Sequence, residues 1–246
     1  MPAWRCPSCG VGHLMLHAEK NLVVKETPQS IRDRDDEAWE PDWVRSVFAC
    51  VFQCSKPECR EEISCVGVGA VAVREYDDPT HGWVQDAVDE FTPSFFSPPL
   101  VLIDIPSSCP TSATQHLLES STLYFADPGA AINCARSAVE AVLTDLGVRR
   151  YIIQKGKRRR PLDLHSRIEK LPAKYEALKK PLIAVKWLGN AGSHDGDPPG
   201  ATQLRETYDL LEHALNEIYA PKARHLAALA KKVIKRKGRV SAVKRR

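Results

Sequence analysis

The sequence contains no long hydrophobic run. Its apolar stretches, such as residues 66–73, fall far short of the ~18 residues that a membrane-spanning helix needs. The first residues also lack the apolar core of a signal peptide. We therefore expect a cytoplasmic protein with no membrane partner, in which cysteine thiols stay reduced.

Acidic residues are missing from one end of the chain. Residues 220–246 contain eleven Lys or Arg and no Asp or Glu. Since the whole chain has a net charge of +4, residues 1–219 have a net charge of −7. A basic tail of this kind contacts phosphates through residues such as Lys235, Arg236 and Lys237, although a tail that only keeps the protein soluble has the same composition.

The rest of the composition is that of a folded protein. Apolar residues make up 43% and charged residues 27% of the 246 positions, which excludes collagen, a coiled coil or disorder throughout. Strand-like alternation dominates residues 1–74, apart from a polar loop expected at 27–42, and helical spacing dominates residues 111–235. We expect a mainly α, α+β protein with a β domain at 1–74, a proline-rich extended linker at 75–110, a helical bundle at 111–235 and a basic tail at 236–246.

Two close cysteine pairs, Cys6-x2-Cys9 and Cys54-x4-Cys59, lie in the strand-like region. Two such knuckles on neighbouring hairpins supply the four soft ligands that Zn²⁺ prefers. The spacing therefore predicts a zinc ribbon whose metal is structural, with no open position for water. Other residues stay in competition as ligands: Cys50, Cys65, His13 and His17.

The segment Gly189-Asn190-x3-His194 is the strongest candidate for a catalytic site in the helical region. Asn190 and His194 share a helical face with Lys186, so a cation, an amide and an imidazole stand together. Such groups hold a phosphodiester and move a proton. The alternative is mechanical, with glycine allowing close packing, Asn capping and His bonding a carbonyl.

Two further basic features accompany this segment. Arg136 and Glu140 are spaced i,i+4 on the preceding long helix, where they either join the site or form a surface salt bridge. Residues 149–160 contain seven Lys or Arg, including Arg158, Arg159 and Arg160. We expect these last three to bind nucleic acid.

Taken in order, these motifs resemble one family. The two cysteine pairs precede residues 135–140 (ARSAVE), 164–168 (LHSRI) and 188–194 (LGNAGSH). This arrangement is similar to the domain of unknown function 4145 family, a helical module that resembles HEPN domains, here behind a zinc ribbon. The resemblance implies a dimeric helical bundle, and for many HEPN domains a metal-independent RNase of toxin, restriction or phage-defence systems.

The HEPN domains that this region resembles have a catalytic motif that consists of an Arg, a polar residue next to it and a His a few residues later. Asn190 and His194 match it, whereas the Arg position falls on Gly189, which has no guanidinium to hold the phosphate. Lys186 or Arg136 is then needed as the substitute. His194 would act as general acid or base, Asn190 would orient the substrate, and Lys186 with Arg136 would stabilise the charge on phosphate.

The resemblance leaves three functions open. The first is a nucleic-acid-directed effector with RNase activity and a homodimeric structure. The second is a non-catalytic module that dimerises and docks a protein partner of a defence system, or nucleic acid. The third is a DNA-associated component whose ribbon and tail contact duplex.

Overall fold

The computed structural model describes residues 4–17, 21–152, 158–191 and 199–235. It divides into two compact units. The first comprises Met1–Val101 with Ser121–Ala126, and the second comprises Leu102–Ser120 with Asp127–Arg246. Among the described residues, no helix combines the length and apolar character that crossing a membrane requires.

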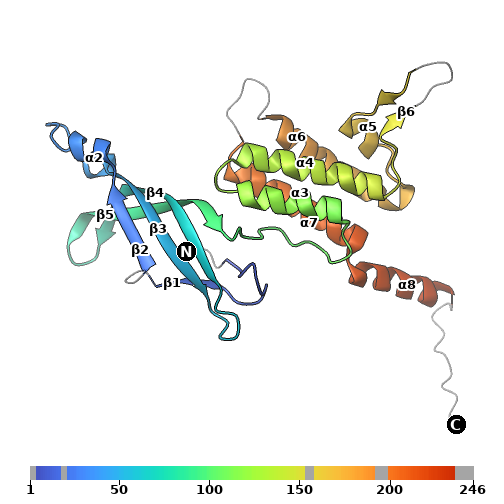
Figure 1. Ribbon diagram of the computed structural model, residues 1–246, viewed down its shortest axis with the longest axis horizontal. Coiled ribbons are helices and arrows are strands. Elements are labelled where there is room, and N and C mark those ends of the chain that lie inside the picture. The colour runs from blue at the N-terminus through green and yellow to red at the C-terminus, as the bar shows by residue number, and fades with distance from the viewer. Residues whose placement is uncertain (1–3, 18–20, 153–157, 192–198, 236–246) are drawn as a thin grey trace, which may run out of the picture. The chain divides into compact units, whose positions relative to one another are not determined.

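The first unit is built on a five-stranded antiparallel sheet (Figure 1). Its elements are β1 (Leu14–Leu16), β2 (Leu22–Glu26), α2 (Pro28–Asp33), the 3-10 helix η1 (Pro41–Trp43), β3 (Arg45–Cys54), β4 (Glu62–Asp78) and β5 (Gly82–Ser97). The order is β1-β3-β4-β5, and β2 also pairs with β3. This sheet is larger than the ribbon that the cysteine spacing predicts.

One face of the sheet forms the core of the first unit. Alternate residues of β3 and β4 are buried, among them Phe48, Phe52 and Ile63. Trp4 contacts the rings of Phe52 and Phe96 edge-on, with centroids 5.6 and 5.0 Å apart. This aromatic cluster covers the buried face of the sheet.

Two segments expected to lack regular structure are ordered elements. The predicted loop at 27–42 contains α2, which begins after the N-cap Thr27, and η1. The predicted linker at 75–110 was wrong for its first part, because β4 continues to Asp78 and β5 occupies Gly82–Ser97. Prolines at a sheet edge, such as Pro93 in β5, do not stop a strand that pairs on only one side.

The second unit is mainly helical. Its elements are α3 (Thr111–Leu123), α4 (Pro128–Asp145), β6 (Tyr151–Ile152), β7 (Arg160–Pro161), α5 (Leu164–Ile168), η2 (Ala173–Leu178), α6 (Lys179–Ala191), α7 (Ala201–Tyr219) and α8 (Pro221–Lys235). Helix α4 packs against α6 and α7, and α6 packs against α7 (Figure 1). The helical region that periodicity predicts is thus present.

The long helix α4 shows why the periodicity is informative. Asp127 caps it by accepting a 2.8 Å hydrogen bond from the Ala130 N–H, and Pro128 takes the first helical position. Gly147 follows its end with φ of +79°. The apolar stripe is buried: Ala131, Ile132, Ala135, Ala138, Val139, Val142 and Leu143. Helix α6 continues through Gly189 and ends at Ala191.

Candidate metal centre and nucleic-acid interface

Cys6, Cys9, Cys54 and Cys59 converge on one point of the first unit. Their four sulfur atoms all lie within 4.8 Å of one another. The Sγ atoms of Cys6 and Cys59 are 3.8 Å apart, and those of Cys9 and Cys54 are 3.7 Å apart. Since a tetrahedral zinc site with Zn–S bonds of about 2.3 Å places its sulfurs about 3.8 Å apart, the cluster is compatible with zinc.

The backbone of each knuckle is arranged around the sulfurs. The N–H of Gly12 donates to Cys9 Sγ (3.3 Å), and the N–H of Lys56 donates to Cys54 Sγ (3.4 Å). The bond from Gly12, with a second from Val11, lowers the pKa of Cys9 to about 6. Position 12 must be glycine, because a Cβ there would collide with Cys54 Sγ. Turn geometry thus directs the sulfur atoms of both knuckles toward one point.

The rival ligands lie elsewhere in the first unit. Cys50 and Cys65 face each other across β3 and β4 and are buried in the sheet. Burial raises the pKa of Cys65 to about 12, which makes this thiol inert. His13 and His17 are exposed and outside the cluster.

In the second unit, Arg136 occupies the space in front of Gly189. A Cβ built on Gly189 would lie 3.1 Å from both Cγ and Nε of Arg136, and closer still to Cδ. The missing side chain on α6 therefore admits a long basic side chain from α4. Within the described part of the chain, Arg136 makes no ion pair or hydrogen bond.

The other residues of the predicted catalytic group are only partly placed. Lys186 lies on α6 with its Nζ 4.1 Å from the ring centre of the exposed Trp187. Asn190 lies in the last turn of the same helix, but its side chain is outside the described residues. His194 falls within 192–198 and is outside them as well.

Glu140 does not pair with Arg136, although their i,i+4 spacing suggested either a joint site or a salt bridge. Its carboxylate accepts a 3.3 Å hydrogen bond from Arg167 of α5. Arg167 is only 1% exposed, and its Nη2 also donates to Thr144 Oγ1 (2.8 Å) and to the carbonyl of Glu140 (3.1 Å). Burial lowers the pKa of Arg167, and the neighbouring Glu140 opposes that shift. Glu140 therefore fixes α5 on α4.

The basic segment at 149–160 includes a short hairpin. Tyr151 and Ile152 of β6 pair with Pro161 and Arg160 of β7. The guanidinium of Arg159 lies 3.6 Å from the ring centre of Tyr151. Arg158, Arg159 and Arg160 are all exposed, so the hairpin presents cations beside an aromatic ring.

Two surface pockets adjoin this hairpin. One, of about 390 Å³, is lined by Arg158 and Arg160 with Asp163 and Ser166 of the α5 start. The other, of about 570 Å³, is lined by Arg149, Arg150, Tyr151 and Arg159. Cations around a hollow that includes an aromatic face suit a phosphate and its base. Periodicity alone did not reveal the Tyr151 contact, which only the hairpin register creates.

Of the three predicted phosphate-binding residues near the C-terminus, Lys235, Arg236 and Lys237, the structure describes the first. Lys235 is exposed at the end of α8. Arg236 and Lys237 lie outside the described residues.

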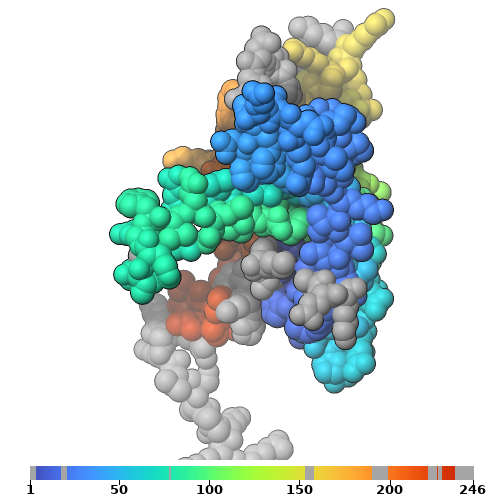
Figure 2. All heavy atoms as spheres, turned by 90° about the vertical axis from the view of Figure 1, so that its left-hand side faces the viewer, coloured from blue at the N-terminus to red at the C-terminus, as the bar shows by residue number. Residues whose placement is uncertain are grey.

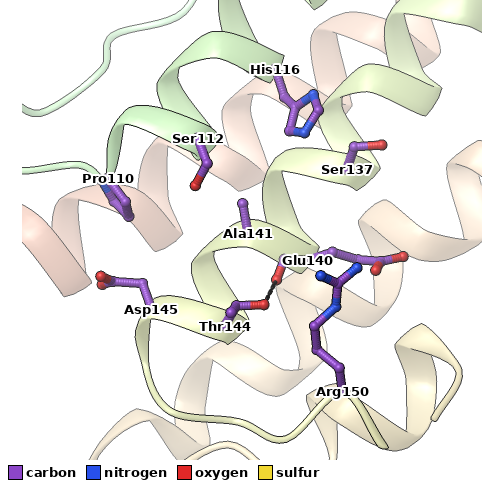
Figure 3. A pocket seen from close by; sticks show the side chains of 9 residues that line it. All are labelled: Pro110, Ser112, His116, Ser137, Glu140, Ala141, Thr144, Asp145 and Arg150. Atoms are coloured by element: carbon purple, nitrogen blue, oxygen red, sulfur yellow. Dashed lines mark hydrogen bonds between the residues drawn. The ribbon is translucent and has the colours of Figure 1, made fainter. Parts of the chain in front are cut away.

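A third pocket, of about 480 Å³, lies between α3 and α4 (Figure 3). His116 and Ser112 line it from α3, and Glu140 lines it from α4 with Arg150 reaching toward it from the following loop. Sequence reasoning missed this pocket, because α3 and α4 meet there only in the folded bundle. Its walls carry charges of both signs.

A family model described as domain of unknown function (DUF4145) matches residues 119–242. The chain belongs to this family. A second family model, domain of unknown function (DUF8608), matches residues 1–96. No curated protein and no solved structure matches the chain. The DUF4145 match spans α4 to α8, so the basic hairpin and the Arg136–Gly189 contact lie inside it.

Proposed function

We propose that this DUF4145 protein is a HEPN-like effector that binds RNA through its helical unit and cleaves it without a metal ion. The observation that carries the proposal is the position of Arg136 in front of Gly189. The HEPN motif has an arginine where this chain has Gly189. A guanidinium delivered from α4 to the same point supplies the lost phosphate ligand from a neighbouring helix.

The remaining roles follow from the order of residues along α6. His194 acts as general acid or base on the ribose 2′-hydroxyl or the leaving 5′-oxygen. Asn190 orients the substrate, and Lys186 adds a second positive charge one turn earlier. The exposed arginines of the β6–β7 hairpin gather RNA by electrostatic attraction.

The assay uses purified protein and structured RNA in Mg²⁺-free buffer with EDTA. We expect cleavage that falls by at least roughly 100-fold in His194→Ala and in Arg136→Ala, because each removes a group acting in the transition state. Arg205→Ala, an exposed arginine on α7, is the matched control and should cleave normally. Cleavage that persists in His194→Ala overturns the proposal.

A position swap tests the Arg136 argument separately. Gly189→Arg alone should fold poorly, because its Cβ meets Arg136. Arg136→Gly combined with Gly189→Arg opens that space and moves the guanidinium to the motif position. Recovery of cleavage in the double variant, measured against Arg136→Gly, supports a shared site. A double variant as inactive as Arg136→Gly assigns Arg136 to packing.

The same contact favours a second function, a non-catalytic binding module. There, Gly189 serves only to let α4 and α6 approach, and the helical unit docks RNA or a protein partner of a defence system. In that case His194→Ala leaves RNA affinity unchanged, and no cleavage is found in the unmodified protein. Salt-dependent gel shifts on RNA and duplex DNA then identify the ligand.

We infer that the four cysteines hold a structural Zn²⁺ in either function. The feature that supports this metal is geometric: the separations of the four sulfur atoms match a closed tetrahedral site. The metal would tie the segment before β1 to the β3–β4 turn.

A further inference from the structure

The β6–β7 hairpin divides its arginines between two pockets. Arg158 and Arg160 line the pocket of about 390 Å³, whereas Arg159, between them in sequence, lines the pocket of about 570 Å³. This is the alternation of side chains along a strand. In Figure 2 the yellow atoms of the hairpin lie at the surface. We call the larger pocket the arginine pocket; its lining residues are Thr144, Gly147, Val148, Arg149, Arg150, Tyr151 and Arg159.

The arginine pocket has positive charge without a counterion. Three of its lining residues are arginines, and none of the described lining residues is acidic. The two acids that lie closest to Arg150, on the neighbouring pocket of Figure 3, have other partners. The Glu140 carboxylate accepts from Arg167 (3.3 Å), and the Asp145 carboxylate accepts from the Tyr219 hydroxyl (2.8 Å). Within the described chain, the three pocket guanidiniums form no ion pair or hydrogen bond.

These arginines are not needed to complete the fold at the end of α4. The carbonyl groups of Val142, Leu143 and Thr144 already accept hydrogen bonds from the backbone N–H groups of residues 146–148. Burial lowers the pKa of Arg167, and the charge of the nearby Arg150 lowers it further. The uncompensated cations therefore repel one another, and a bound anion would offset that repulsion.

The shape of the arginine pocket fits a small ligand. Its volume falls within the roughly 300–1,000 Å³ of small-molecule sites. The guanidinium of Arg159 lies 3.6 Å from the ring centre of Tyr151, so one wall is a stacked pair of planar groups. Arg149 and Arg150 follow the turn at Gly147, whose φ is +79°. A Cβ added at Gly147 would meet no atom within 4 Å, so the pocket is open there.

We propose that the arginine pocket binds a polyphosphate group such as that of a nucleoside triphosphate. Arg149, Arg150 and Arg159 each present a fork of donors that matches phosphate oxygens. Three such forks around one hollow suit several charges on adjoining phosphates, whereas each phosphodiester of an RNA strand carries a single charge. The Tyr151–Arg159 stack offers a plane on which a base can lie. RNA is left to the other side of the hairpin, with Arg158 and Arg160.

The first test is calorimetric titration of the full-length protein with ATP in EDTA, with thermal melting to confirm folding. The unmodified protein should bind ATP. Arg149→Ala/Arg159→Ala should raise the dissociation constant at least roughly tenfold, because charge-assisted hydrogen bonds to phosphate are lost. Arg158→Ala/Arg160→Ala is the matched control, with the same charge removed from the other side of the hairpin, and should change it less than about twofold.

A titration with tripolyphosphate separates the two sources of the group. Weaker binding than ATP assigns the base to the Tyr151–Arg159 stack, and equal binding assigns the site to phosphates alone. An unmodified protein that does not bind ATP overturns the proposal, as does an equal loss in the two arginine pairs. No RNA cleavage enters these measurements, so their outcome is independent of the ribonuclease proposal.

A second pair of variants tests the location without removing an arginine. Asp and Asn have the same shape, and both tolerate the left-handed backbone found at Gly147. Gly147→Asp adds a negative charge to the arginine pocket, and Gly147→Asn adds none. ATP should bind at least roughly fivefold more weakly to the Asp variant than to the Asn variant, because like charges repel. Equal affinity in the two variants would place the ligand elsewhere.

Discussion

At the residue scale, Arg167 is a charged group held in the interior of the helical unit. Its buried guanidinium bonds to α4 at the Glu140 carboxylate, the Glu140 carbonyl and Thr144, and so fixes α5 on α4. A buried cation is stable only with this many acceptors. The sequence places Arg167 in an ordinary amphipathic segment, and nothing in its spacing indicates burial.

Arg167→Met should therefore lower the free energy of unfolding by about 3 kcal/mol, because it removes several charge-assisted hydrogen bonds at a buried site. Urea denaturation of the helical transition measures this. Lys179→Met is the control: Lys179 pairs with Glu176 at 3.0 Å where that carboxylate is exposed, so the loss should stay below about 1 kcal/mol. Equal losses in the two variants would contradict a structural role for Arg167.

At the scale of elements, the β6–β7 hairpin orders a group of arginines although each of its strands has only two residues. The register sets Tyr151 and Ile152 against β7, and Arg159 stacks on the Tyr151 ring. The hairpin thereby presents its arginines on an ordered frame beside α5. If the hairpin binds RNA as proposed, this pre-organisation would lower the entropy lost on binding.

Arg158→Ala/Arg160→Ala should weaken binding of single-stranded RNA and reduce the slope of log affinity against log salt by about 1.4. Each phosphate contact on a single strand contributes about 0.7 to that slope. Fluorescence anisotropy at several salt concentrations measures both quantities. Lys170→Ala/Lys180→Ala, which removes two exposed lysines outside the hairpin, should leave the slope unchanged. A slope reduced equally by both pairs would mean that only net charge matters.

At the scale of the whole molecule, the chain contains two cores. The aromatic cluster around Trp4 and the sheet belong to the first unit, and the α4–α6–α7 contacts belong to the second. The cysteine cluster lies entirely in the first. Loss of a metal there should destabilise one core and spare the other.

Elemental analysis should find one zinc per chain, and Cys9→Ser/Cys59→Ser should lose it. Calorimetry should then show one of two transitions moving down by at least roughly 10 °C, since each kcal/mol shifts the Tm of a domain of this size by about 4–8 °C. Cys134→Ser, in the helical unit, is the control and should retain zinc. A chain that binds no zinc, or loss of zinc that moves both transitions together, would argue against this arrangement.

The sequence by itself determined the local features of this protein. Cys6-x2-Cys9 and Cys54-x4-Cys59 identified the metal-compatible cluster, because knuckle spacing is a local property. The N-cap Asp127 followed by Pro128 at the start of α4 is a local signal of the same kind. The sequence did not exclude Cys50 and Cys65 as metal ligands. The sheet register excludes them, because it buries this pair between β3 and β4.

Tertiary structure decided which distant residues meet. Spacing suggested a pair of Arg136 and Glu140, yet packing sends Arg136 to Gly189 and Glu140 to Arg167. The first part of the proline-rich segment predicted as a linker forms the end of β4 and all of β5, because strand pairing supplies hydrogen bonds that local propensity does not count. Periodicity shows which face of a single helix or strand is buried and which is exposed to solvent. Contacts between elements depend on how several buried faces pack together, and the sequence of one segment does not determine that packing.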